Sequence, residues 1–226
     1  MAQTALQTRN SNSPNGAGEG PSGPLQGTIF LVRHGETELN TENRIRGWSD
    51  VDLDEKGAQG VAQTGQLLSN LPISQIVTSD LSRSEQSSHI LANHLFVPVE
   101  PSRELRPWDL GKYTQMKLSE VSDVMTKHIN NPQKKVEGGE SFGDFLGRWK
   151  SGLQGLVARA LQDPSKAVIG VTHSRNIEAT RYFLDGKKDT LVKANTVPPS
   201  GVMALQIRGG RLHEVPFANS HLEKDE

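Results

Sequence analysis

The chain has 226 residues, a formal net charge of −1 at pH 7 and no cysteine; 34% of its residues are hydrophobic and 23% are charged. This length favours one folded domain with a sizeable core, and the balanced charge gives no sign of a nucleic acid or an anionic membrane as partner. The absence of cysteine excludes disulfides, thiolate catalysis and cysteine-ligated metal sites.

The two ends of the chain read differently from its middle. Residues 1–26 are rich in Gly, Asn, Ser, Pro, Gln and Thr without an apolar pattern, which predicts a disordered leader. Residues 219–226 predict a flexible tail, which leaves a domain at 27–218. No stretch has the apolar length of a membrane span and no apolar signal region begins the chain, so we expect a soluble, cytoplasmic protein. The sequence leaves both a monomer and a homodimer open.

Strand and helix patterns alternate along the predicted domain. Apolar or extended runs predict strands at Thr28–Arg33, Gln75–Thr78, Phe96–Val99 and Ala167–Val171. Amphipathic periodicity predicts helices at Asp54–Leu71, Leu81–Leu95, Met116–Ile129 and Ser174–Leu184, and Ser141 with Asp144 predicts the capped start of another long helix. Gly201–Ile207 and Leu212–Val215 flank RGGR, a predicted hairpin turn. This alternation predicts the α/β class with a largely parallel sheet.

Four polar clusters stand at or near the predicted strand ends. Arg33 and His34 follow the first strand in RHGET, Arg83 lies one turn into a helix in TSDLSRS, and His173 ends a third strand in GVTHS. The fourth cluster is LRPWDLG, residues 105–111. Because ligands of open α/β sheets bind beyond the carboxyl ends of the strands, we expect the basic groups to converge on one place.

Arginines and histidines that converge without cysteine predict phosphate chemistry. The guanidinium fork matches phosphate oxygens, and a neutral imidazole can attack phosphorus and hold the phosphoryl group covalently. The alkoxide that leaves then needs a proton from a carboxylic acid.

In five motifs the sequence resembles the histidine phosphatase superfamily, also called phosphoglycerate mutase-like. The motifs are LVRHGETELN, RIRGWSDVDLDEKG, TSDLSRSEQS, GGESFGDFLGR and VTHS, and the resemblance spans roughly Thr28 to Pro216. It implies the three-layer α/β/α fold of that family, a phosphohistidine formed on His34, and a small-molecule phosphate ester as substrate. The residues implied to hold the phosphate or line its pocket are Arg33, Asn40, Arg46–Gly47, Arg83 and His173, with no metal and no organic cofactor.

The sequence departs from the family at the proton donor. Many members carry a glutamate four residues before the glycine that corresponds to Gly111, and Pro107 stands there instead. Asp109 is the preferred substitute, because a two-residue shift along an extended segment keeps the same face, and Glu104 is the second candidate.

The departure also bears on the activity. The missing mutase-like ERHYG pattern favours a metal-independent phosphomonoester hydrolase, acting on a small phosphorylated metabolite, over a phosphoglycerate-type mutase. Pro107 keeps a third alternative open, a non-catalytic module that binds a phosphorylated ligand.

Overall fold

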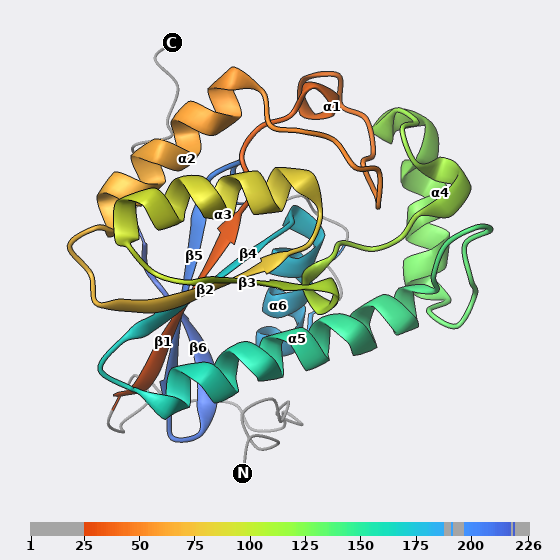
Figure 1. The fold of residues 1–226 in the computed structure, drawn as a ribbon. Coiled ribbons are helices and arrows are strands. Elements are labelled where there is room, and N and C mark those ends of the chain that lie inside the picture. The colour runs from red at the N-terminus through yellow and green to blue at the C-terminus, as the bar shows by residue number, and fades with distance from the viewer. Residues whose placement is uncertain (1–24, 188–190, 192–196, 218, 220–226) are drawn as a thin grey trace.

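A six-stranded sheet forms the centre of the molecule (Figure 1). The computed structural model describes residues 25–187, 191, 197–217 and 219. The strands are β1 (Leu25–Arg33), β2 (Ile73–Ser79), β3 (Val99–Ser102), β4 (Ala167–Thr172), β5 (Val202–Arg208) and β6 (Arg211–Val215). Their order is β3-β2-β4-β1-β5-β6; the first four run parallel, and β5 is antiparallel to both β1 and β6. The predicted mostly parallel α/β sheet is confirmed.

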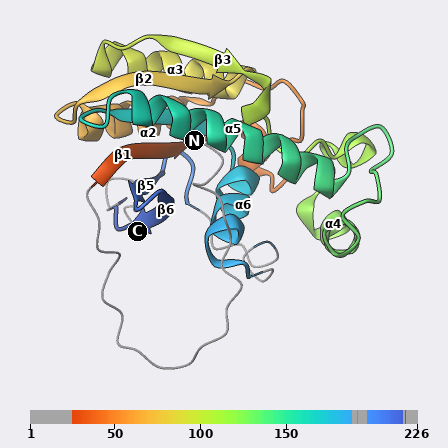
Figure 2. The ribbon, with the colours of Figure 1, turned by 90° about the horizontal axis from the view of Figure 1, so that it is seen from below.

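Helices cover both faces of this sheet. On one face lie α2 (Glu55–Leu68) and α3 (Ser82–Leu95), and on the other lie α5 (Phe142–Gln162) and α6 (Ser174–Asp185), as Figures 1 and 2 show. Helix α4 (Leu118–Asn130) stands beyond the end of the sheet, and α1 (Glu38–Thr41) is a single turn. Short 3-10 turns at Arg103–Leu105 and Gly111–Tyr113 connect β3 to α4.

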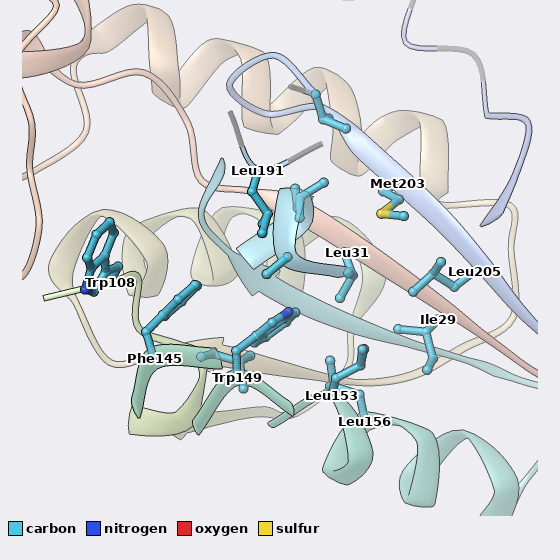
Figure 3. Close-up of a cluster of buried hydrophobic side chains, with 14 of the residues drawn as sticks. Ile29, Leu31, Trp108, Phe145, Trp149, Leu153, Leu156, Leu191, Met203 and Leu205 are labelled. Carbon is cyan, nitrogen blue, oxygen red and sulfur yellow. The ribbon is translucent and has the colours of Figure 1, made fainter. Parts of the chain in front are cut away.

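Strand β1 is apolar on both sides because both sides are covered. Ile29 and Leu31 pack into the cluster beneath α5, whereas Phe30 and Val32 pack into the cluster beneath α2 and α3. Figure 3 shows the first cluster, in which Trp149, Leu153 and Leu156 of α5 face β1. A strand that is buried on both faces requires a continuous apolar run. The run ends at Arg33, which therefore lies at the carboxyl end of β1.

The predicted cap of the long helix is present. The Ser141 side chain accepts a hydrogen bond from the N–H of Asp144 at 3.0 Å, and the Asp144 carboxylate accepts one from the N–H of Ser141 at 3.4 Å. These bonds satisfy two of the donors that a helix start leaves open.

Three boundaries differ from the predictions. Strand β1 begins at Leu25, inside the segment predicted to be disordered, because Leu25 pairs with Arg208 of β5; residues 1–24 lie outside the described residues. Phe96 is not extended: it ends α3 in the left-handed conformation, and β3 starts only at Val99. The Asn219 side chain bonds the backbone of Val202 at 2.8 and 3.1 Å, so the first residue of the predicted tail is anchored, and residues 220–226 are not described.

Candidate active site

Three parallel strands bring the predicted site together. Arg33 is the last residue of β1, His173 follows β4 as the N-cap of α6, and Arg83 lies in the first turn of α3, which follows β2. Because the parallel strands β2, β4 and β1 are neighbours in the sheet, their carboxyl ends lie side by side at one end of it. There the rings of His34 and His173 lie with their centroids 5.0 Å apart.

His34 is buried, neutral and held in one orientation. It is 1% exposed, and its Nδ1 lies 2.7 Å from the carbonyl oxygen of Gly35. A carbonyl can only accept, so Nδ1 carries the proton and Nε2 keeps its lone pair. Burial, followed by the positive charges of Arg83, Arg46 and Arg33, lowers the pKa of His34 well below its usual value. The imidazole is therefore an uncharged nucleophile at neutral pH.

Within the described part of the chain, the guanidinium groups of Arg33 and Arg83 bond only to backbone carbonyls. Arg33 Nη1 donates to Val197 O at 2.9 Å, and Arg83 donates to Ser49 O at 2.8 Å and to Gly47 O at 3.0 Å. The Nε atoms of both are buried and have no hydrogen-bond partner among the described residues. Burial lowers the pKa of Arg33 to about 10 and that of Arg83 to about 9, so both stay charged at neutral pH.

Arg46 adds a third guanidinium to the same pocket. Among the described residues, the Arg46 guanidinium makes one long hydrogen bond, from Nη1 to Arg44 O at 3.4 Å. Burial and the charge of Arg33 lower the pKa of Arg46 to about 10, which leaves it cationic. Two buried cations and one half-buried cation, without a carboxylate partner among the described residues, form a site whose electrostatics favour an anion.

His173 is oriented by serine hydroxyls. Its Nε2 lies 2.9 Å from Ser79 Oγ and 3.5 Å from Ser84 Oγ, while its Nδ1 is buried and unpartnered among the residues described. Burial, followed by the charge of Arg83, lowers its pKa well below the usual value. When Nε2 accepts from Ser79, Nδ1 carries a proton that an anionic oxygen can accept.

The loop after His34 is pressed against the start of α2. A Cβ added to Gly35 would lie 2.5 Å from Gly57 O, and one added to Gly57 would lie 2.2 Å from Glu36 O. Such contacts require glycine on both sides. Further along the loop, the Asn40 side chain accepts from the N–H of Thr37 at 3.2 Å and from its hydroxyl at 2.8 Å, which holds Asn40 at the pocket.

These side chains line one cavity of about 440 Å³. Of the residues expected at the site, it contains Arg33, His34, Asn40, Arg46, Gly47, Arg83 and His173. This volume suits a small organic molecule.

The expected proton donors do not line this cavity, and Pro107 does. The Asp109 carboxylate instead accepts a hydrogen bond from the N–H of Gly111 at 3.1 Å, and Glu104 is an exposed residue of a 3-10 turn. The assignment of Asp109 or Glu104 as proton donor stays a prediction that this geometry does not support.

Two other carboxyl groups line the cavity, Glu36 and Glu178. Glu36 pairs with the exposed Lys56 at 3.0 Å. Glu178, in α6, is 5% exposed, accepts from Ser174 Oγ at 3.2 Å and pairs with Arg175 at 2.6 Å. Burial outweighs the nearby positive charges and raises the pKa of Glu178. The sequence does not mark Glu178 as a functional residue: it is an acidic residue five positions after His173 and belongs to none of the motifs.

Among the residues described, no cluster of three or more His, Asp or Glu side chains could hold a metal ion. None of the described helices combines the length and the apolar character needed to cross a membrane.

A neutral imidazole held among buried guanidinium groups is suited to phosphoryl groups, and the fold and the site together are of the class of α/β phosphoryl-transfer enzymes. Comparison with known proteins identifies the family. The model of the histidine phosphatase superfamily (branch 1) matches residues 29–219, so the chain belongs to this superfamily and the resemblance is confirmed.

Individual relatives include both mutases and phosphatases. The probable phosphoglycerate mutase GpmB of Salmonella choleraesuis (strain SC-B67) is 32% identical over 130 residues, which are 55% of this chain and 60% of that protein. The chain thus spans less than two thirds of this curated relative.

Solved structures share the fold. A mycobacterial glucosyl-3-phosphoglycerate phosphatase, complexed with VO3, matches with a TM-score of 0.73 and 20% identity over 84% of this chain and 98% of its own. The phosphoglycerate mutase of Bacillus anthracis str. Sterne matches with a TM-score of 0.73 and 22% identity over 86% and 94% of the two chains.

Proposed function

We propose that this protein is a metal-independent phosphomonoester hydrolase that works through a phosphohistidine on His34 and acts on a small phosphorylated metabolite. The observation that carries the proposal is the state of His34. Its Nδ1 lies 2.7 Å from Gly35 O, its Nε2 has no hydrogen-bond partner among the described residues, and His34 lines the cavity together with Arg33, Arg46 and Arg83. A neutral nucleophile beside unpaired cations fits attack on a phosphate ester.

The reaction has two steps on these residues. In the first, Nε2 of His34 forms a bond to phosphorus while the bond from phosphorus to the ester oxygen breaks. The guanidinium groups and His173 stabilise charge on the phosphoryl oxygens. In the second step, water attacks phosphorus, the bond from phosphorus to nitrogen breaks, and phosphate leaves with His34 neutral again.

The leaving oxygen needs a proton, and we assign this proton to Glu178. Its carboxyl group lines the cavity and is 5% exposed. Burial raises its pKa, so a larger fraction is protonated near neutral pH than for an exposed glutamate. The carboxylate left after the first step then takes a proton from the attacking water.

The first experiment is release of phosphate from p-nitrophenyl phosphate with EDTA present, together with mass spectrometry of the acid-sensitive phosphohistidine. We expect turnover by the wild type and none by His34→Ala. Turnover that survives in His34→Ala would overturn the phosphohistidine mechanism. Activity that EDTA abolishes would overturn the metal-independent one.

Leaving groups of different basicity test the proton donor. Glu178→Gln is expected to slow hydrolysis of an alkyl phosphate about 10²-fold or more, and that of p-nitrophenyl phosphate much less, because nitrophenolate leaves without a proton. Glu36→Gln and Asp109→Asn are the matched controls. If one of them shows this selective loss instead, that residue is the donor and Glu178 is not.

A mutase is the second candidate, because the relative that is 32% identical carries the name of a probable phosphoglycerate mutase. A mutase returns the phosphoryl group to a second hydroxyl, whereas a phosphatase releases it. Inorganic phosphate in amounts equal to the alcohol released supports the hydrolase. Transfer to phosphoglycerate with little free phosphate supports the mutase, and ligand binding without a phosphohistidine supports the binding module.

A further inference from the structure

Beyond the phosphate-binding side chains, one part of the cavity wall is apolar, while Glu36, Asn43, Arg44, Ser174, Arg175 and Glu178 form a polar part. Its apolar lining residues are Ile45, Pro107, Trp108, Leu110, Leu118 and Met125. They come from the loop before α2, from the connection between β3 and α4, and from α4 itself. These apolar residues offer a surface to the alcohol half of an ester whose phosphate meets the arginines.

Hydrogen bonds join the loop before α2 to the start of α4. The N–H of Ile45 donates to Met116 O at 2.9 Å, the N–H of Gln115 donates to Ile45 O at 2.6 Å, and the N–H of Leu118 donates to Asn43 O at 2.9 Å. Backbone bonds of this kind hold Ile45 and Leu118 in fixed positions. The apolar wall is therefore formed before any ligand arrives.

Leu118 is the side chain that this wall leaves open. It is 47% exposed, whereas Ile45, Trp108, Leu110 and Met125 are between 1% and 8% exposed. Covering an exposed leucine with an apolar ligand is favourable, and covering it with a hydroxylated ligand is not.

We propose that the substrates of this site are phosphate monoesters of apolar alcohols, alkyl or aryl, whose body covers Leu118. This inference rests on the proposed phosphomonoesterase function. It names the substrate class, and it distinguishes the site from one built for polyhydroxylated sugar acids.

A homologous series of substrates tests the inference. The series is ethyl, butyl, hexyl and octyl phosphate, with glycerol phosphate as the polar reference. The value of kcat/KM is expected to rise by up to roughly fourfold per methylene until the cavity is full, and glycerol phosphate should be the poorest substrate. A flat series, or a preference for glycerol phosphate, would overturn the inference while leaving the phosphohistidine mechanism intact.

Leu118→Asn is the matching variant, and Leu67→Asn is its control. Leu67 is 44% exposed, lies in α2 and does not line the cavity. Leu118→Asn is expected to lower the ratio of kcat/KM for hexyl phosphate to kcat/KM for glycerol phosphate about 3- to 10-fold. Leu67→Asn should leave this ratio unchanged. Equal losses in both variants would assign the effect to folding and contradict a role for Leu118.

Calorimetry with alkylphosphonates separates the two proposals, because these compounds bind without being hydrolysed. Affinity that rises with chain length in the wild type and not in Leu118→Asn supports the apolar wall even if no ester is turned over. Affinity that is independent of chain length refutes it, whatever the activity.

Discussion

Gly57→Ala tests how tightly the catalytic loop is fixed to the scaffold. Gly57 lies in the first turn of α2, where its N–H donates to the carboxylate of Asp54 at 2.6 Å. A Cβ at this position would stand 2.2 Å from Glu36 O and 2.5 Å from Glu36 N. Ordinary contacts of a Cβ begin at 3.4 Å, so the loop that carries His34 must move by about 1 Å.

The expected magnitude follows from two opposing effects. Alanine is the better helix former by up to about 1 kcal/mol, which would stabilise α2. Overpacking against a backbone that is itself held in place costs about 1–3 kcal/mol. The overlap with Glu36 is large, so we expect a net loss of about 1–2 kcal/mol in the free energy of unfolding. Because Glu36 is two residues from His34, the same shift should lower kcat about 10²-fold.

Gly147→Ala is the control with the opposite sign. Gly147 lies within α5, and nothing would lie within 4 Å of its Cβ. It should gain roughly 0.5–1 kcal/mol in stability at unchanged kcat. Urea unfolding and initial rates measure both quantities. If Gly57→Ala is as stable and as active as Gly147→Ala, the loop is not fixed by α2 and the reasoning fails.

Three further predictions concern the titration of the histidines, the charge of Arg83 and the hydrogen bonds of Arg148. Because the folded pKa values of His34 and His173 lie well below that of an exposed histidine, the unfolded chain binds more protons below about pH 6.5. Stability should fall as pH falls from about 6.5, by up to about 1.4 kcal/mol per pH unit for each imidazole, and His34→Gln should halve the slope seen in urea titrations. Arg83→Gln, which removes a charge that lowers the pKa of His34, should move the acid limb of kcat/KM to higher pH and weaken inhibition by phosphate about 10-fold or more; an unmoved limb would contradict this. Arg148 donates to Arg106 O at 2.8 Å and to Pro107 O at 2.9 Å, and Arg148→Lys should cost about 1–3 kcal/mol in urea unfolding; an unchanged midpoint would refute the role of these bonds.

The parts of the fold that could be predicted from sequence are those that depend on local pattern. The apolar run ending at Arg33 marks a strand buried on both faces, and parallel strands bring their carboxyl ends together whatever the details of packing. This is why Arg33, His34, Arg83 and His173 could be expected at one place before any contact was known. The pairing of Leu25 with Arg208, by contrast, depends on a strand distant in sequence.

Asp109 shows where local pattern is insufficient. Its assignment relied on the two-residue period of an extended segment, yet Pro107 lines the cavity and Asp109 does not. The chain turns directly after Asp109, where Leu110 has φ −96° and ψ 9° and Gly111 has φ +46°. Long-range bonds set this course: the N–H of Asp109 donates to Glu140 at 3.0 Å, and the N–H of Glu140 donates to Asp109 O at 3.2 Å. The residue spacing of LRPWDLG contains no sign of Glu140.

The arginines of the pocket differ from other arginines of the molecule in the groups that they bond to. Several arginines elsewhere pair with carboxylates, as in Arg106 with Asp80 at 2.6 Å and Arg148 with Glu140 at 2.5 Å. At the pocket, Arg33 and Arg83 are buried, yet their bonds to the residues that the structure describes go only to carbonyl oxygens. Burying a cation without a counter-ion costs stability, and a carboxylate partner would remove that cost. It would also weaken the positive field that, after burial, lowers the pKa of His34. The arrangement therefore gives up folding stability and leaves the place of the counter-ion to a phosphate.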